Sequence, residues 1–142
     1  MKMLLAVDGS KYSLDAVKCL VAHADWYRDK PEVELLFVHA PVPKLPGMSK
    51  VVGKNQIQRY YAEEGDAALA DAKKLLERAG IRYQATLLVG QPADEIVKQA
   101  ASKRCDLIFI GTRGRTAAGN MLLGSVATKV LHSATLPVML VR

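Results

Sequence analysis

Short apolar runs alternate with longer amphipathic segments along this chain. A short apolar run bounded by turn residues is typical of a strand, and an unbroken run is typical of a strand that is covered on both faces. Five such runs predict five strands, at residues 3–7, 33–40, 83–89, 107–110 and 138–141.

Between these runs the apolar residues recur at helical spacing. Ser10 is a natural N-cap, and the apolar positions after it predict the first helix. Residues 57–79 predict a long second helix that stops at Gly80, and Pro92 suits the first turn of a third. Residues 126–132 predict the last helix, whereas residues 41–55 are irregular and rich in proline and glycine.

The resulting order is β-α-β-α-β-α-β-α-β, which predicts the α/β class. We expect one domain, residues 1–142, with an open, twisted, five-stranded and mostly parallel Rossmann-like sheet and helices on both faces. The last strand is expected at a sheet edge. Ligands of such sheets bind outside the carboxyl ends of the strands, at the switch point of the strand order.

Composition narrows the class of ligand. The chain has 142 residues, of which 50% are hydrophobic, so it can form a core without disulfides or a structural metal. Its formal net charge is +6, but no run of five or more Lys and Arg residues occurs. We therefore expect a small anionic ligand rather than a nucleic acid.

The cysteines and the apolar runs bear on location in the cell. The two cysteines show no pairing pattern and are read as reduced core thiols. No apolar run approaches the ~20 residues that cross a bilayer, and Asp8 interrupts the short N-terminal run. We expect no membrane segment and a cytoplasmic location.

The candidate chemistry lies in residues 111–125, GTRGRTAAGNMLLGS, which link the fourth strand to the last helix. Glycines permit positive φ angles and let a backbone approach a ligand without an intervening Cβ. Successive exposed N–H groups bind anions, and Ser125 at a helix N-terminus favours phosphate. Arg113 and Arg115 can add charge-assisted contacts. The alternative reading is a glycine-rich turn with a purely structural role.

Other phosphate-binding and metal-binding patterns are absent from the sequence. The segment nearest to a P-loop, residues 47–54, fails in its spacing, and no GxGxxG follows the first strand. The three histidines are scattered without metal-ligand spacing.

In combination, these motifs resemble the ATP-binding branch of the universal stress protein family. The spacing G-2x-G-9x-G-S at Gly111, Gly114, Gly124 and Ser125 is that family's motif. The resemblance extends over the whole chain, through the segments DGS at 8–10, VHA at 38–40 and VGQP at 89–92. It implies the adenine nucleotide alpha hydrolase-like variant of the Rossmann-like sheet and a stress-response or regulatory role.

The resemblance also implies a set of nucleotide contacts. Asp8 matches the acid near the ribose and phosphates, and Ala40 matches the residue whose backbone contacts adenine. Gly111, Gly114, Gly124 and Ser125 match the phosphate and ribose contacts. The candidate nucleotide-binding residues are Val7, Asp8, Ser10, Ala40, Val89, Gly90, Gly111, Thr112, Arg113, Gly114, Gly124, Ser125 and Val126.

ATP is the expected ligand, and ADP, AMP and a cyclic nucleotide stay open. Asp8 is the one candidate to hold Mg²⁺, through the phosphates. Hydrolysis needs a positioned metal and a group that orients water, and no second acid or Gln is clearly placed to help. Three functions therefore stay open: a nucleotide-binding regulatory protein, an ATPase with at most slow turnover, and a nucleotide-free dimeric scaffold.

Two further expectations concern assembly and substitution. Residues 137–142 are apolar, and an exposed strand edge invites pairing, so we expect a homodimer through this strand, as the family also pairs. A side chain at Gly114 is expected to intrude on the phosphates while the fold stays intact.

Overall fold

The computed structural model describes residues 1–43, 53–115 and 122–142. Within them one sheet of five strands has the order β3-β2-β1-β4-β5, and its four strand pairings are all parallel. The strands are β1 (Lys2–Val7), β2 (Glu32–His39), β3 (Tyr83–Val89), β4 (Leu107–Gly111) and β5 (Val138–Val141). The predicted strands and the open parallel sheet are confirmed, with β5 at one edge and β3 at the other.

The helices also follow the predicted segments. They are α1 (Lys11–Ala22), the 3-10 turn η1 (Ala24–Trp26), α3 (Lys54–Arg78), α4 (Pro92–Ser102) and α5 (Ser125–Ser133). Helix α3 begins three residues earlier than expected, because Gln56 accepts a hydrogen bond from Gly53 N through its side chain and so closes the first turn. The expectation of an irregular stretch at 41–55 therefore fails at residues 54 and 55, and it lies outside the described residues at 44–52.

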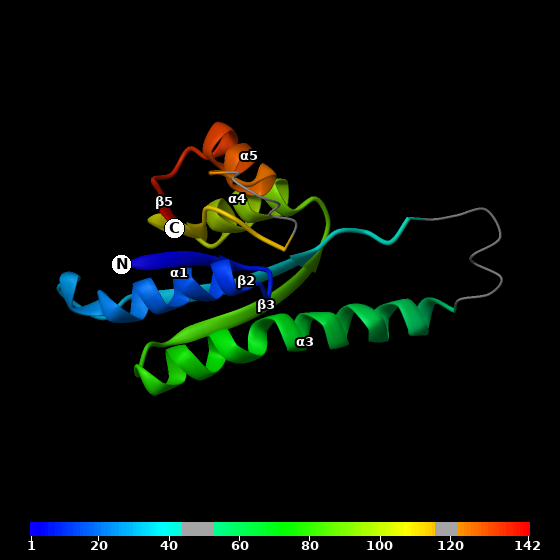
Figure 1. Cartoon of the computed structure of the whole chain (residues 1–142), viewed down its shortest axis with the longest axis horizontal. Coiled ribbons are helices and arrows are strands. Elements are labelled where there is room, and N and C mark those ends of the chain that lie inside the picture. The colour runs from blue at the N-terminus through cyan, green and yellow to red at the C-terminus, as the bar shows by residue number, and fades with distance from the viewer. Residues whose placement is uncertain (44–52, 116–121) are drawn as a thin grey trace.

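Two helices cover each face of the sheet (Figure 1). Helices α1 and α3 pack on one face, where Val17, Leu20, Leu69 and Leu76 meet alternate residues of β1 and β2. Helices α4 and α5 pack on the other face, through residues such as Ile96 and Val130. Because both faces are covered, the central strands carry the long apolar runs from which the sequence predicted them.

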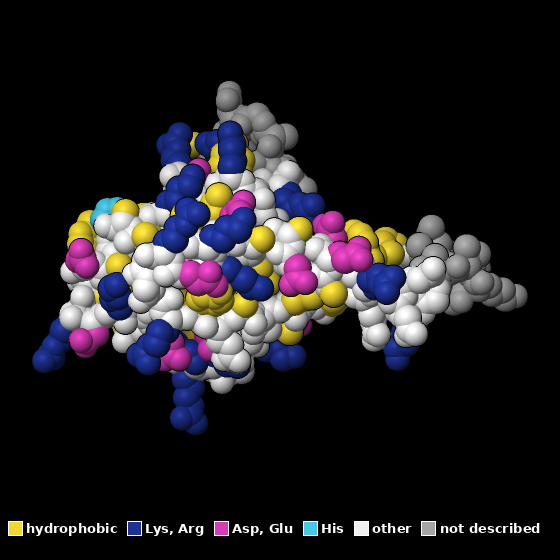
Figure 2. Space-filling view, turned by 90° about the horizontal axis from the view of Figure 1, so that it is seen from below, with side chains coloured by type: hydrophobic (Ala, Val, Ile, Leu, Met, Phe, Trp, Pro, Cys, Tyr) yellow, Lys and Arg dark blue, Asp and Glu magenta, His cyan; other side chains and the backbone are white. Residues whose placement is uncertain are grey.

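Helix α3 is longer than the strands beside it. Its first turns project beyond the sheet, next to the segment that leaves β2 (Figure 1). Residues 53–60 are exposed apart from the half-buried Ile57, and regular burial starts only at Gly65. The projection is also visible in the space-filling view, where acidic side chains lie between the basic ones (Figure 2).

None of the helices in the described parts of the chain is long and apolar enough to span a membrane.

Candidate functional site

A cavity of about 390 Å³ opens at the carboxyl ends of β1, β2 and β4. In this sheet β1 lies between β2 and β4, so the chain winds away from it in both directions. The cavity therefore occupies the switch point at which parallel sheets bind their ligands. Its other walls come from the start of α4, the turn at 111–115 and the start of α5.

One end of the cavity is apolar. Leu36, Phe37 and Val38 of β2 line it together with Ile96 of α4 and Ile110 of β4. Four of these five side chains are buried, and Val38 is half-buried. This end can take up a flat, weakly polar group by removing its surface from water.

His39 and Ala40 form the rim of this apolar end. The ring nitrogen Nδ1 of His39 lies 2.6 Å from the carbonyl oxygen of Ala40 and is the donor of that hydrogen bond. The His39 ring meets Tyr60 and Tyr61 of α3 at centroid distances of 5.4 and 4.9 Å. Tyr61 also accepts a 2.8 Å hydrogen bond from Val42 N through its hydroxyl oxygen. Helix α3 thus holds the chain segment that leaves β2.

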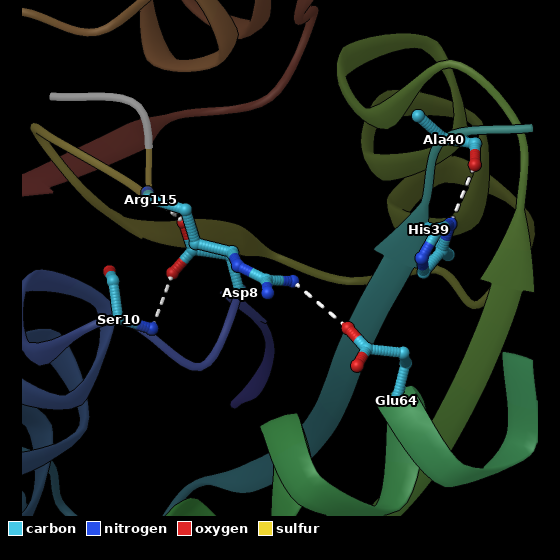
Figure 3. Close-up of polar contacts among 6 residues, drawn as sticks. All are labelled: Asp8, Ser10, His39, Ala40, Glu64 and Arg115. Carbon is cyan, nitrogen blue, oxygen red and sulfur yellow. Dashed lines mark hydrogen bonds and ion pairs between the residues drawn. The ribbon is translucent and has the colours of Figure 1, made fainter. Parts of the chain in front are cut away.

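Asp8 stands at the polar end, directly after β1. Its Oδ1 accepts a 3.0 Å hydrogen bond from Ser10 N, and its Oδ2 accepts a 2.8 Å bond from Arg115 N (Figure 3). Asp8 N in turn donates to the hydroxyl of Ser13 at 3.2 Å. The carboxylate is therefore fixed between the start of α1 and the glycine turn, 107 residues away along the chain.

The main chain of the turn and of the start of α5 also contributes to the polar end. Thr112 N donates to Val141 O and Gly124 N donates to Thr112 O, both at 2.7 Å, so the turn is tied to β5 and to the start of α5. The N–H groups of residues 125–127 have no acceptor inside the helix. Ser125, Val126 and Ala127 line the cavity, and the positive end of the helix dipole there favours an anion.

Two reasons are expected for glycine in this turn, positive φ and close approach of the backbone, and the structure supports only close approach, here to protein atoms. Among the described glycines only Gly9 and Gly80 have positive φ, so positive φ is the wrong explanation for Gly111, Gly114 and Gly124. Close approach is the cause. A Cβ at Gly111 would lie 2.9 Å from the carbonyl oxygen of Tyr12, and one at Gly114 would lie 2.5 Å from Asp8 Oδ2.

This contact also changes the expectation for substitution at Gly114. A side chain there meets the Asp8 carboxylate before any ligand is present. The glycines therefore have a structural role, and they also line the cavity.

The two arginines of the turn differ in their surroundings. The Arg113 guanidinium lies over the ring of Tyr12, 5.5 Å from its centroid, and Arg113 Nε is buried with no hydrogen-bond partner among the described residues. The Arg115 guanidinium reaches α3 instead, where Nη1 lies 3.4 Å from Glu64 Oε2.

The structure brings most of the predicted residues together. Those that line the cavity are Val7, Asp8, Ala40, Gly111, Thr112, Arg113, Gly114, Gly124, Ser125 and Val126. Ser10, Val89 and Gly90 are not among the lining residues. The Ser10 hydroxyl caps α1 by accepting from Ser13 N at 3.2 Å, Val89 ends β3 beside His39, and Gly90 N donates to His39 O at 2.9 Å.

Sequence reasoning missed Ser13 and Glu64. Ser13 is only 5% exposed, lines the cavity and joins Asp8 to the cap of α1. Its position three residues after an N-cap serine is a signal that was available. Nothing local marks Glu64, because its partner Arg115 is 51 residues away in the sequence.

The described residues contain no group of three or more His, Cys, Asp or Glu side chains that is arranged to hold a metal ion. Asp8 keeps acceptor capacity beyond its two hydrogen bonds, because two carboxylate oxygens offer about four lone-pair sites. A divalent cation therefore fits Asp8 only as a shared ligand with a bound phosphate.

Comparisons with known proteins agree with this architecture. The family model of the universal stress proteins matches residues 1–142. The universal stress protein MJ0531 of Methanocaldococcus jannaschii is 36% identical over 141 residues, which are 99% of this chain and 81% of that protein.

Two solved structures show the same arrangement. Protein MJ0577 of M. jannaschii superposes with a TM-score of 0.80 at 28% identity, over 99% of this chain and 94% of that one. A universal stress protein from Archaeoglobus fulgidus in complex with dAMP superposes with a TM-score of 0.67 at 25% identity, over 100% of this chain and 98% of that one. By sequence and by fold, this chain belongs to the universal stress protein family.

Proposed function

We propose that this protein binds an adenine nucleotide, ATP foremost, in the cavity at the carboxyl ends of β1, β2 and β4, and that it acts as a regulatory binding protein in the stress response. One observation carries the proposal: the same cavity is lined by buried apolar side chains and by the glycine turn with its two arginines and the start of α5. A nucleotide has the same division between base and phosphates. The volume lies in the range of ~300–1,000 Å³ that small-molecule sites occupy.

Each end has a stated role in this proposal. The base lies between β2 and Ile96, with the main chain of Ala40 at its edge. The phosphates lie on the turn at 111–114 and on the N-terminus of α5, where main-chain donors and a helix dipole favour negative charge. The dAMP complex of the related A. fulgidus protein supports an adenine nucleotide as the class of ligand.

Magnesium enters the proposal through Asp8. When Mg²⁺ is bound, Asp8 would hold it, and the ion would neutralise part of the phosphate charge. Titrating Mg²⁺ against ATP affinity tests this role. A bridging ion makes ATP binding by the native protein depend on Mg²⁺ and removes that dependence in Asp8→Ala.

Binding rather than hydrolysis is the proposed activity. Hydrolysis needs a residue that orients the attacking water, and of the acids in the described residues only Asp8 lines the cavity. Its carboxylate already accepts two main-chain hydrogen bonds. A phosphate-release assay distinguishes a binding protein from a slow ATPase.

We further propose a homodimer through β5. This strand lies at the edge of the sheet, so one row of its main-chain groups has no partner strand among the described residues. Met139 is 37% exposed on it, which leaves apolar surface beside that edge. Pairing of two β5 strands around a two-fold axis would satisfy the main chain and cover the side chain.

The first experiment is to denature the purified protein and identify released nucleotide by mass spectrometry, then to titrate the emptied protein with ATP, ADP, AMP and cyclic AMP. Near-stoichiometric adenine nucleotide, or binding of added ATP, is the expected result. Protein that carries none and binds none of the four contradicts the proposal and favours the scaffold.

A further inference from the structure

The ion pair between Arg115 and Glu64 crosses from the glycine turn to α3. Arg115 is fixed at its main chain, where its N–H donates to Asp8, but its guanidinium extends away toward Glu64 (Figure 3). Arg115 lines the cavity whereas Glu64 does not. Arg115, a residue of the cavity wall, therefore pairs its guanidinium with the carboxylate of Glu64, which lies outside the cavity.

The exposure of the turn residues to solvent increases from Gly111 to Arg115. Gly111 is buried, residues 112–114 are half-buried and Arg115 is exposed. A phosphate chain that starts against Gly111 and leaves toward solvent reaches Arg115 last. In the proposed binding mode, this order puts the phosphate next to the ribose deepest and the outer phosphates nearest to Arg115.

Of the two arginines in the turn, Arg115 is the one that can change partner. Arg113 is packed against Tyr12 and is half-buried. The Arg115 and Glu64 side chains are 56% and 34% exposed, and ion pairs this open to water contribute only ~0–1 kcal/mol. Charge-assisted hydrogen bonds from Arg to phosphate are stronger than neutral ones and are often bidentate, so an outer phosphate can take Arg115 from Glu64.

We propose that Arg115 determines specificity for the number of phosphates and that Glu64 is its internal competitor. In the nucleotide-free protein Arg115 pairs with Glu64. An outer phosphate of ATP displaces Glu64, whereas the single phosphate of AMP lies too deep to do so. This inference rests on the proposed nucleotide binding and adds to it the residues that distinguish ATP from AMP.

The test measures ATP and AMP affinities by calorimetry for the native protein and four variants: Glu64→Gln, Arg115→Gln, the double variant, and Glu63→Gln. Glu63 is the control, because it is exposed on the same helix, forms no ion pair among the described residues, and its substitution changes the net charge by the same amount.

Relative to the Glu63→Gln control, Glu64→Gln is expected to tighten ATP binding roughly 1.5- to 5-fold, the range that corresponds to an exposed ion pair, and to leave AMP binding unchanged. Arg115→Gln is expected to weaken ATP binding roughly tenfold with little effect on AMP. In the Arg115→Gln background, Glu64→Gln should give no further gain.

The outcomes separate this inference from the proposed function. If the native protein binds ATP and AMP but Glu64→Gln matches the control, or if Arg115→Gln weakens both ligands equally, the specificity role is wrong and nucleotide binding stands. If the native protein binds neither nucleotide, both proposals fail. The Arg115 side chain is exposed and the Glu64 side chain is half-buried, and unchanged thermal midpoints confirm that the variants fold.

Discussion

The contact between Gly114 and Asp8 gives the sharpest prediction about the site. In Gly114→Ala the new Cβ would lie 2.5 Å from Asp8 Oδ2, and, apart from the adjacent residues of the chain, the only atoms within 4 Å of it in the described residues belong to the Asp8 carboxyl group. The carboxylate must move by roughly 1 Å to reach ordinary van der Waals distance. That movement stretches its 2.8 Å bond from Arg115 N beyond the ~3.2 Å limit of a good hydrogen bond.

The size of the effect follows from the bond that is lost. Hydrogen bonds to charged groups contribute ~1.5–3 kcal/mol, and the partial exposure of Asp8 favours the lower end. We expect Gly114→Ala to lower the free energy of unfolding by about 1–2 kcal/mol, which lowers the thermal midpoint by roughly 3–8 °C for a chain of this size.

A double-mutant cycle tests this reasoning. Urea unfolding gives the free energies of the native protein, Gly114→Ala, Asp8→Ala and the double variant. Because Asp8→Ala removes the atoms that the new Cβ meets, Gly114→Ala should cost almost nothing in that background. Costs that add within about 0.5 kcal/mol would refute the steric argument. The cycle also shows how far a loss of ATP binding in a Gly114 variant reflects a displaced Asp8 rather than a blocked phosphate site.

Three further predictions concern the edge, the thiols and a buried acid. Met139→Lys should shift the protein from dimer toward monomer in sedimentation at micromolar concentration; a native protein that is already monomeric would contradict the proposed dimer. Cys105 is 4% exposed, and burial raises the pKa of its thiol. At neutral pH an alkylating reagent should therefore modify the half-buried Cys19 of the folded protein before Cys105. The reverse order would show that Cys105 is accessible. Lys2→Ala should lower the urea midpoint because it removes the cation that lies 2.9 Å from the buried Glu34 carboxylate. Adding Glu34→Leu should restore the midpoint, because it removes the unpaired charge. Equal midpoints for Lys2→Ala and the native protein would show that the pair does not stabilise the fold.

Local sequence patterns predicted most of the fold. Each of the five apolar runs became a strand. For the central strands β1, β2 and β4 the reason is that a parallel strand covered on both faces leaves an apolar run that is visible in a single sequence. Ser10 and Gly80 marked a helix start and a helix end by chemistry that acts within a few residues. The region of the site was predictable for the same reason, since parallel strands place their carboxyl ends at one edge of the sheet.

The details of the site depended on contacts between distant segments. Asp8 and Arg115 are 107 residues apart, and Glu64 and Arg115 are 51 apart, so no local pattern pairs them. The same limit applies to the glycines, for which the sequence suggested positive φ and close approach to a ligand, whereas the structure shows close approach to Tyr12 and Asp8.

The chain's own sequence thus determined its strands, its helices and the edge of the sheet at which a ligand is expected, because periodicity and capping act over a few residues. Tertiary structure alone decided that Glu34 is buried beside Lys2, that Ser10, Val89 and Gly90 stay off the cavity lining, and that α3 reaches the glycine turn. Those features arise where segments far apart in the chain meet, and their free energy depends on distances that only the folded chain sets.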